Sequence, residues 1–269
     1  MKMLRNKKIG VIGMGNMGAS ILEGVLARRL ATSSHIWVYD VAEPRARTFA
    51  RHHGVRLALS VAELLKNTDI VLLAMKPQDF ALFAAENRIC FKPGQIVISI
   101  LAGMTTEKIS KAIGKNVVVV RAMPNLGAKV GHSMTVVCGK NKTALSFAEK
   151  LFAGCGEVVT LQEKRLDLVT AISGSGPAYL FLFAEAFLEA AIKIGMDAKT
   201  AKILVYNTLS GGAKLMSASK DTPAMLRQKV TSPNGTTAAA LAVFESRDFK
   251  KIVLHAVEAA KKRSEEMTK

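Results

Sequence analysis

The 269-residue sequence has little cysteine, and its three cysteines do not form a recognisable ligand set. Cys90, Cys138 and Cys155 are odd in number, lie far apart and each sit among apolar neighbours. This pattern matches neither the paired spacing of a zinc site nor a disulfide framework. We predict three reduced cysteines among the core residues, and no bound metal.

The sequence also lacks an apolar run long enough to cross a bilayer. The longest such stretch, Ala178–Ile194, is interrupted by Glu185 and Glu189 and falls short of the roughly 20 residues that a span needs. The first residues are basic, but the apolar run after them has only the length of a strand and breaks into glycines, unlike a signal peptide. We therefore expect no membrane span and a cytoplasmic location.

Acidic residues are scarce relative to basic ones, with 21 Asp and Glu against 38 Lys and Arg and a formal net charge of +17. Such an excess raises nucleic-acid binding as an alternative. The basic residues are scattered, however, with modest clusters only at Arg5–Lys8 and Lys261–Arg263, and the few aromatic residues mostly lie in apolar helical patterns. We expect a solvated basic surface that attracts anionic cofactors and carboxylates, and no nucleic-acid partner.

The first 162 residues alternate short β-branched runs with helical patterns, which is typical of βαβ units. The runs are apolar at successive positions, as expected for a parallel sheet that is covered on both faces. A helix is expected near Thr143–Ala153. The expected strands are Lys8–Ile12, His35–Tyr39, Ile70–Ala74, Ile96–Ile100, Val117–Arg121, Met134–Cys138 and Glu157–Thr160.

Residues 163–269 read as successive helices without strands. The expected starts are Ser175–Pro177, Asp197, Asp221–Pro223, Ser232–Pro233 and Asp248. The segment Ala178–Ile192 is apolar on nearly every side, so neighbours must enclose it, and a second subunit could supply some of them. The predicted fold class is α/β, with an N-terminal Rossmann dinucleotide-binding domain (1–162) followed by an all-helical C-terminal domain (163–269).

A glycine-rich turn follows the first expected strand and opens a helical pattern. Its order of strand, turn and helix is that of a dinucleotide site, in which the first glycine permits the turn, the second admits a pyrophosphate and the third allows close packing. The second strand ends at Asp40, 22 residues after the last glycine, as the motif requires. The predicted cofactor-binding residues of the turn are Gly13, Met14, Gly15, Asn16, Met17 and Gly18.

Asp40 also bears on the choice of dinucleotide. A carboxylate there can accept both ribose hydroxyls but would repel a 2′-phosphate, which favours NADH over NADPH. Arg45 and Arg47 follow closely and could still meet a 2′-phosphate, or be merely solvated. After the fourth strand, Ala74, Lys76 and Pro77 leave the sheet at its carboxyl edge and are further predicted cofactor contacts, although Lys76 could instead face solvent.

Two later segments, Ile172–Tyr179 and Val230–Thr237, combine glycines with hydroxyls before helices. Each could bind an anion at a helix N-terminus or simply cap the helix. Together with the glycine turn and a fourth motif they occur in an order and spacing that closely resemble pyrroline-5-carboxylate reductase. The four motifs are Gly13–Gly18, Arg121–Asn125, Ser173–Tyr179 and Ser232–Thr237.

The resemblance covers essentially the whole chain. It implies that a cyclic C=N bond, that of 1-pyrroline-5-carboxylate, is reduced to L-proline by NADPH or NADH, in the last step of proline biosynthesis. It also implies a homodimer through the helical domain, with dimers often gathered into larger rings such as a decamer, and an active site between subunits. The substrate carboxylate would bind Ser232, Asn234, Gly235 and Thr236, with Thr237 as the catalytic hydroxyl beside the ring nitrogen.

The sequence departs from this family's pattern at two positions. Many members carry Ser or Thr where this chain has Asp40, so an NADPH preference does not simply carry over. Asn234 stands where the family usually has glycine, but Asn tolerates left-handed backbone angles, so the turn should survive.

Two other enzyme classes share the architecture. A β-hydroxyacid dehydrogenase would need a lysine where Leu180 stands, and a metal-dependent reductoisomerase would need more acidic ligands than Glu185 and Glu189. A nucleotide sensor or nucleic-acid-binding protein on a Rossmann core is the non-enzymatic alternative.

Overall fold

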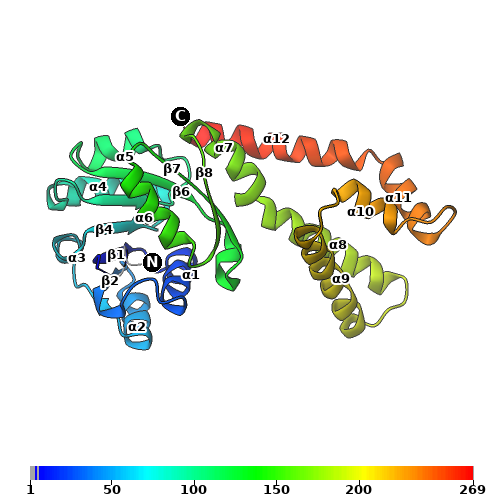
Figure 1. The fold of residues 1–269 in the computed structure, drawn as a ribbon, viewed down its shortest axis with the longest axis horizontal. Helices are drawn as coiled ribbons and strands as arrows, with labels where there is room; N and C mark the ends of the chain where they lie inside the picture. The colour runs from blue at the N-terminus through cyan, green and yellow to red at the C-terminus, as the bar shows by residue number, and fades with distance from the viewer. Residues whose placement is uncertain (1–3, 5, 269) are drawn as a thin grey trace. The chain divides into compact units, whose positions relative to one another are not determined.

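The computed structural model describes residues 4 and 6–268, which form two compact units (Figure 1). One unit contains the chain as far as Ser175 together with the segment from Ala260 onward, and the other is Gly176–Ala259. By contacts, the first turns of the helical half therefore pack with the sheet. The predicted boundary after residue 162 falls inside the first unit and stays a prediction.

The first unit is built on an eight-stranded sheet with the order β3-β2-β1-β4-β5-β6-β7-β8. All seven expected strands are present, with ends shifted by one or two residues. The eighth, β3, is a two-residue edge strand that begins with Arg56 and carries no apolar pattern. The strands are β1 (Ile9–Ile12), β2 (Ile36–Tyr39), β3 (Arg56–Leu57), β4 (Ile70–Leu73), β5 (Ile96–Ser99), β6 (Val118–Met123), β7 (Ser133–Gly139) and β8 (Gly156–Thr160).

The sheet is parallel, as expected, except at one pairing. Strand β7 runs antiparallel to β6, whereas every other neighbouring pair is parallel. The reason is the connection, because a parallel pair needs a crossover of a dozen or more residues. Only a short loop with the 3-10 turn Leu126–Val130 joins β6 to β7, so the chain reverses beside the strand that it has just left.

Helices cover both faces of the sheet and enclose two large cores, beside a small third cluster around Val136, Cys138 and Leu166. One core receives side chains from α1 (Asn16–Ala27), α2 (Glu43–His53) and α6 (Lys142–Phe152). The other receives them from α3 (Val61–Asn67), α4 (Phe80–Asn87) and α5 (Thr106–Ile113). Because both faces are covered, β1 and β4 are buried at all four of their positions, which confirms the prediction made from their continuous apolar runs.

The parallel strands bring their carboxyl ends to one edge. The register aligns Ile12 with Tyr39 and Leu73, and Leu73 with Ser99. The loops after β1, β2, β4 and β5 therefore begin side by side. Ligands of open α/β sheets bind at this edge.

The second unit is helical, as predicted. Two predicted starts are confirmed by their caps, since Asp197 accepts a hydrogen bond from the Thr200 N–H at 3.0 Å and Thr222 accepts one from the Met225 N–H at 3.3 Å. Four helices lie in it and a fifth begins there. They are α8 (Gly176–Lys193), α9 (Ala198–Ala218), α10 (Pro223–Lys229), α11 (Thr236–Ser246) and α12 (Phe249–Thr268).

The predicted helix start at Ser232–Pro233 is wrong. Helix α11 begins at Thr236, and the residues before it form a turn. Asn234 has a φ of +57°, which is left-handed and incompatible with an α-helix. The same angle confirms that Asn tolerates the conformation this turn requires.

Apolar side chains of the second unit lie open in the single chain. Helix α8 has no buried residue within the described chain, and Phe181 and Leu182 are 57% and 66% exposed. By length and composition alone, the helical run Glu163–Lys193 could also cross a membrane. In its most apolar stretch of 18 residues, 11% of the residues are buried. Exposed apolar surface of this kind marks an interaction site.

The cysteines generate a first prediction. Cys138 and Cys155 are buried and Cys90 is half-buried, and all three are free thiols. Burial raises the pKa of Cys138 and of Cys155 to about 11, so both stay protonated near pH 8. Iodoacetamide at pH 8 should therefore modify Cys90 first, and peptide mass spectrometry would identify the modified residue.

The same pKa shifts determine whether the folded protein gains or loses stability as the pH rises. Because the folded pKa lies above the ordinary value of 9.0, the stability from the two protonated thiols is fully present below about pH 9 and is lost as the pH rises through about 11. Unfolding in guanidinium, which exposes all three thiols, serves as the control. Alkylation of Cys138 or Cys155 in the folded protein as fast as in guanidinium would contradict this account.

Candidate functional site

The glycine turn after β1 is held by close backbone contacts. Gly13 has a φ of +102°, and a Cβ there would lie 2.6 Å from the Ala74 carbonyl carbon. A Cβ on Gly18 would collide with the Gly13 carbonyl oxygen. A Cβ on Gly15 would meet no atom within 4 Å. Packing thus requires the first and third glycines, whereas the second borders open space.

Helix α1 begins at this open space. Its N-cap is Gly15, which offers no side-chain cap, and its first turn contains no acidic residue. The N–H groups of Asn16, Met17 and Gly18 precede the first intrahelical bond, from Ala19 to the Gly15 carbonyl at 3.0 Å. Free N–H groups and the positive end of the helix dipole favour an anion such as a pyrophosphate.

Asp40 joins the end of β2 to the glycine turn. Its Oδ2 accepts the Met14 N–H at 2.6 Å, and its Oδ1 accepts the Ala42 N–H at 2.7 Å. The sequence does not indicate the first bond, because its partner lies 26 residues away. Each carboxylate oxygen keeps capacity for a further donor, so the site still fits ribose hydroxyls.

The two arginines after Asp40 differ in their surroundings. Arg47 forms an ion pair with Glu43 one turn earlier in α2, whereas Arg45 is exposed. The described structure thus leaves Arg45 as the more available cation near the end of β2.

The segment after β4 packs against the glycine turn. The Ala74 N–H donates to the Ile12 carbonyl at 2.8 Å, and the Ala74 methyl would lie 3.3 Å from a Cβ on Gly18. Lys76 is exposed and precedes the 3-10 turn Pro77–Asp79. The structure therefore brings Gly13, Asp40 and Ala74 together at the carboxyl edge, while cofactor contacts of Lys76 and Pro77 stay predictions.

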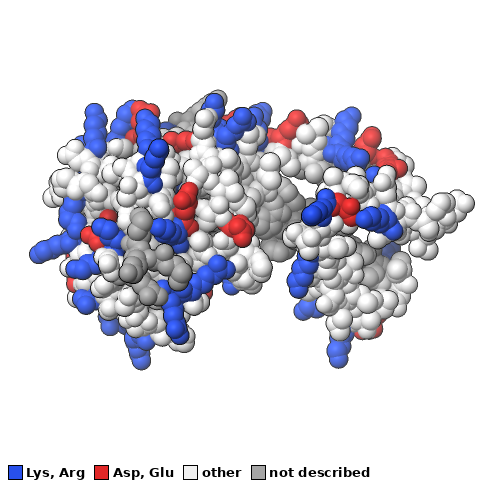
Figure 2. Space-filling view, viewed as in Figure 1, with Lys and Arg blue, Asp and Glu red and all other residues white. Residues whose placement is uncertain are grey.

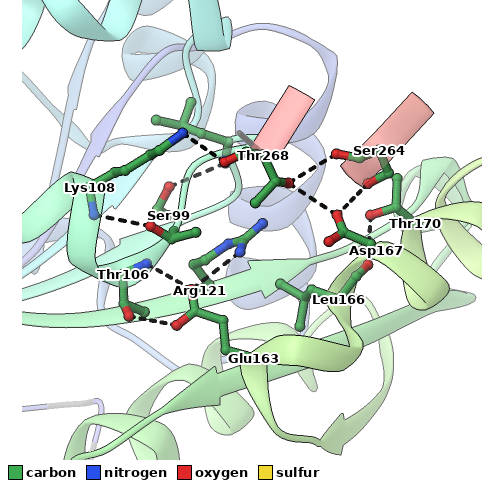
Figure 3. Close-up of polar contacts among 12 residues, drawn as sticks. Ser99, Thr106, Lys108, Arg121, Glu163, Leu166, Asp167, Thr170, Ser264 and Thr268 are labelled. Atoms are coloured by element: carbon green, nitrogen blue, oxygen red, sulfur yellow. Dashed lines mark hydrogen bonds and ion pairs between the residues drawn. The ribbon is translucent and has the colours of Figure 1, made fainter. Parts of the chain in front are cut away.

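Arg121, the first residue of the Arg121–Asn125 motif, has a structural role (Figure 3). Its side chain is 6% exposed and pairs with Glu163 at 3.2 Å. Glu163 also accepts the N–H and the hydroxyl of Thr106, both at 2.7 Å, at the start of α5. The last motif residue, Asn125, donates through Nδ2 to the Ser173 carbonyl at 3.0 Å, so it joins two of the four motifs.

The Ser173–Tyr179 segment is not the helix N-terminus that its sequence suggests. It lies in a nearly continuous helical run that starts at Leu166 and contains a π turn, Thr170–Gly174. The Ser175 N–H donates to the Thr170 carbonyl at 2.8 Å, and the Ser173 hydroxyl donates to the Val169 carbonyl. These groups are therefore engaged within the helix rather than free for an anion.

The Ser232–Thr237 turn of the second unit does present a helix N-terminus. The Gly235 N–H donates to the Ser232 carbonyl at 3.1 Å, and a Cβ on Gly235 would collide with Ser232 Oγ. Gly235 is also the N-cap of α11 and supplies no side-chain cap. Thr236 is exposed and Thr237 half-buried in the first turn, so hydroxyls and free N–H groups border the same surface.

Charge is spread over the surface rather than gathered at one place. Figure 2 shows Lys and Arg side chains distributed across the visible face of both units. Within residues 4 and 6–268, no group of three or more His, Cys, Asp or Glu side chains has the geometry of a metal site. The chemistry that the described site offers is therefore anion binding and hydrogen bonding.

Comparisons with known proteins agree with this arrangement. A family model described as pyrroline-5-carboxylate reductase dimerisation matches residues 163–267, and one described as NADP oxidoreductase, coenzyme F420-dependent, matches residues 8–103. Pyrroline-5-carboxylate reductase 2 of Bacillus subtilis is 36% identical over 268 residues, covering 97% of this chain and 95% of its own. The Escherichia coli pyrroline-5-carboxylate reductase is 33% identical, covering 98% and 99%.

The chain belongs to the pyrroline-5-carboxylate reductase family. Solved structures of the family agree over the whole length. A Coxiella burnetii pyrroline-5-carboxylate reductase superposes with a TM-score of 0.91 at 32% identity, covering 98% of this chain and all of the other. A Plasmodium falciparum pyrroline carboxylate reductase with NADP bound gives 0.89 at 29% identity, covering 99% and 100%.

The rival dehydrogenase class shares only the fold. A 3-hydroxyisobutyrate dehydrogenase of Mycobacterium tuberculosis superposes with a TM-score of 0.53 at 18% identity. The pyrroline-5-carboxylate reductase family thus accounts for the whole chain, and the architecture alone accounts for the dehydrogenase likeness.

The unequal surroundings of the glycines generate a second prediction. Gly15→Ala should fold normally, because the added methyl meets open space, but it should raise the Kd for NADH or NADPH roughly tenfold or more by obstructing the pyrophosphate. Gly18→Ala should instead lower the free energy of unfolding by roughly 2 kcal/mol or more, because its methyl meets backbone.

Thermal unfolding without cofactor and fluorescence titration with cofactor would measure the two effects. Each variant is the control for the other. Equal losses of stability in the two variants, or normal dinucleotide affinity in Gly15→Ala, would refute this reading of the turn.

Proposed function

We propose that this protein is an NAD(P)H-dependent oxidoreductase that reduces 1-pyrroline-5-carboxylate to L-proline, the last step of proline biosynthesis, in the cytoplasm. The observation that carries the proposal is the near full-length identity of 36% to a relative of that name. The glycine turn, Asp40 and the free N-terminus of α1 independently fit a nicotinamide dinucleotide.

Substrate recognition is assigned to the turn before α11. The Ser232 hydroxyl and the N–H groups of Asn234 and Thr236 hold the substrate carboxylate at the positive end of the helix, while Gly235, whose own N–H bonds the Ser232 carbonyl, shapes the turn around it. The support is the described geometry, in which Gly235 permits close contact with Ser232 and leaves the helix uncapped. Neutral donors suffice here because the substrate carries the charge.

Thr237 is proposed as the catalytic hydroxyl. Bound at the glycine turn, the reduced nicotinamide supplies a hydride to the imine carbon. The ring nitrogen must gain a proton as the C=N bond becomes a C–N bond, and the Thr237 hydroxyl hydrogen-bonds that nitrogen and relays the proton from water. Positioning the substrate against the nicotinamide accounts for most of the acceleration.

NADH is the proposed preferred cofactor, with NADPH as the alternative. The Asp40 carboxylate lies at the end of β2, bonded to the glycine turn, where a ribose is expected, and its charge would repel a 2′-phosphate there; Arg47 is already paired with Glu43. Support for NADPH comes from the NADP bound to the Plasmodium relative and from exposed Arg45. The glycine turn itself does not distinguish the two cofactors, because both carry the same pyrophosphate.

We propose a homodimer formed through the helical unit, with dimers assembled into a larger ring such as a decamer. The dimerisation model matches residues 163–267, and α8 exposes Phe181 and Leu182 in the single chain. A second copy that covers these side chains would remove apolar surface from water. No membrane or nucleic acid is needed as a partner in this account.

The activity and the role of Thr237 can be tested together. Purified protein, 1-pyrroline-5-carboxylate and reduced cofactor should form proline as cofactor absorbance falls. Thr237→Ala should lower kcat on the order of 10²-fold, because the proton relay is lost, while Thr237→Ser keeps the hydroxyl and most of the activity. Dinucleotide affinity should be unchanged in both variants.

The outcomes separate the alternatives. No proline with either cofactor, together with retention on DNA that is lost at high salt, would favour the nucleic-acid-binding alternative. Equal kcat in Thr237→Ala and wild type would remove Thr237 from the mechanism but leave the reductase assignment in place.

The cofactor preference has its own test. Asp40→Ser removes the charge, so the ratio of kcat/KM with NADPH to kcat/KM with NADH should rise roughly tenfold. The ratio is informative even if the variant loses overall activity through its lost bond to the Met14 N–H. An unchanged ratio would show that Asp40 does not discriminate between the cofactors.

A further inference from the structure

The chain crosses between its two units twice. It leaves the first unit after Ser175, inside the helical run that starts at Leu166, and returns at Ala260, inside α12. The Ser232–Thr237 turn lies on the stretch of chain between these crossings. Contacts that anchor the chain in the first unit near Ser175 and near Ala260 therefore restrict the positions that the turn can reach.

One carboxylate of the first unit joins both ends (Figure 3). Asp167, on the short helix α7 (Leu166–Val169), accepts the Ser264 hydroxyl of α12 at 2.6 Å. It also accepts the Thr268 hydroxyl at 3.1 Å, and both donors reach the same oxygen, Oδ1. We call Asp167, Ser264 and Thr268 the helix clamp.

The buried position of α12 belongs to the clamp. Ser264 is 6% exposed and is the one buried residue of α12 within the described chain. A buried serine needs a hydrogen-bond partner, and a carboxylate acceptor makes a stronger one than a neutral oxygen. The anchoring of this helix thus depends on a polar contact rather than on apolar packing.

A second contact fixes the same end of α12 at the carboxyl edge of the sheet. Lys108 Nζ donates to the Thr268 carbonyl at 2.7 Å. Gly103, in the loop after β5, has a φ of +72°, and a Cβ there would lie 2.6 Å from the Met267 carbonyl oxygen. The Lys108 and Gly103 contacts do not involve Asp167, so they keep the end of α12 at this edge of the sheet independently of the clamp.

The local fold of α7 does not depend on Asp167. The neighbouring Leu166 is 2% exposed and packs with Val136 and Cys138, which anchors α7 to the sheet. The two hydrogen bonds that the Asp167 carboxylate accepts both come from α12. A change at Asp167 therefore releases the return helix without removing a core side chain.

We propose that Asp167 is a positioning residue for the reduction: by clamping α12 to α7 it fixes both ends of the chain that carries the substrate turn. The inference rests on the proposed function. Loss of the clamp lowers kcat/KM for the imine and leaves dinucleotide affinity unchanged, because the glycine turn and Asp40 lie outside the released segment.

The test compares four single variants and one double variant of the full chain. Asp167→Ala removes both hydrogen bonds of the clamp, and Ser264→Ala removes the shorter of the two. The double variant therefore removes no bond beyond those already lost in Asp167→Ala. Asp167→Asn keeps an acceptor oxygen for both hydroxyls. Ser217→Ala removes an exposed serine hydroxyl that donates to the Ala213 carbonyl within its own helix, and it is the matched control.

Three quantities are measured for each variant: amide hydrogen exchange over residues 260–268, the Kd for NADH without substrate, and kcat and KM for 1-pyrroline-5-carboxylate. For Asp167→Ala and Ser264→Ala we expect about tenfold faster exchange and about tenfold lower kcat/KM, with the Kd within twofold of wild type. The double variant should be no worse than Asp167→Ala. Asp167→Asn and Ser217→Ala should stay within threefold of wild type.

Unchanged exchange in Asp167→Ala would show that the clamp does not hold α12 and would overturn the proposal. Faster exchange with wild-type kcat/KM would overturn the positioning role, as would a parallel loss of NADH affinity and turnover. A wild-type chain that forms no proline would refute the proposed function and, with it, this role. The exchange measurement would still report whether the clamp exists, so the two failures are distinguishable.

Discussion

The structure depends on the contact between the glycine turn after β1 and the end of β4. Gly13 and Gly18 lack side chains where the Ala74 backbone and the Gly13 carbonyl oxygen approach. That contact sets the distance of α1 from the sheet and points the free N–H groups of its first turn at open space beside Gly15. Asp40 then reaches the same turn through the Met14 N–H, so the predicted anion site and the predicted ribose site share one small piece of backbone.

The helical unit follows a different constraint. Its helices have too few neighbours in one chain to bury their apolar residues, and α8 alone exposes several large side chains. A small all-helical unit with so little core gains stability by association. The proposed assembly and the proposed substrate turn before α11 would thereby be linked, since both belong to this unit. The polar clamp at Asp167 suits this arrangement, because it fixes the return helix with few residues.

Much of the fold could be predicted from the sequence where a local pattern determined it. The continuous apolar runs of β1 and β4 and the caps at Asp197 and Thr222 gave the right elements at nearly the right residues. The strand direction of β7 could not be predicted from its own composition, because it depends on the short connection that precedes it. The two-residue strand β3 has no periodicity to detect.

The local geometry of the candidate site was predictable in part. The glycine spacing correctly indicated a tight turn, because backbone approaches Gly13 and Gly18 too closely for a side chain. The roles of these glycines and of Asp40 in dinucleotide binding stay predictions. The start of α11 was placed too early, because the left-handed angle at Asn234 interrupts an otherwise helical pattern. The ion pair of Arg121 and the clamp at Asp167 join residues 42 and about 100 positions apart, and no local pattern marks such pairs.

The most direct test of the central claim is to follow the transferred hydrogen itself. The protein would be incubated with 1-pyrroline-5-carboxylate and NADH that carries deuterium on its transferable C4 position, and the product would be analysed by mass spectrometry and NMR. The account predicts proline with one deuterium on the ring carbon that was doubly bonded to nitrogen. Unlabelled proline, or no proline, would contradict it.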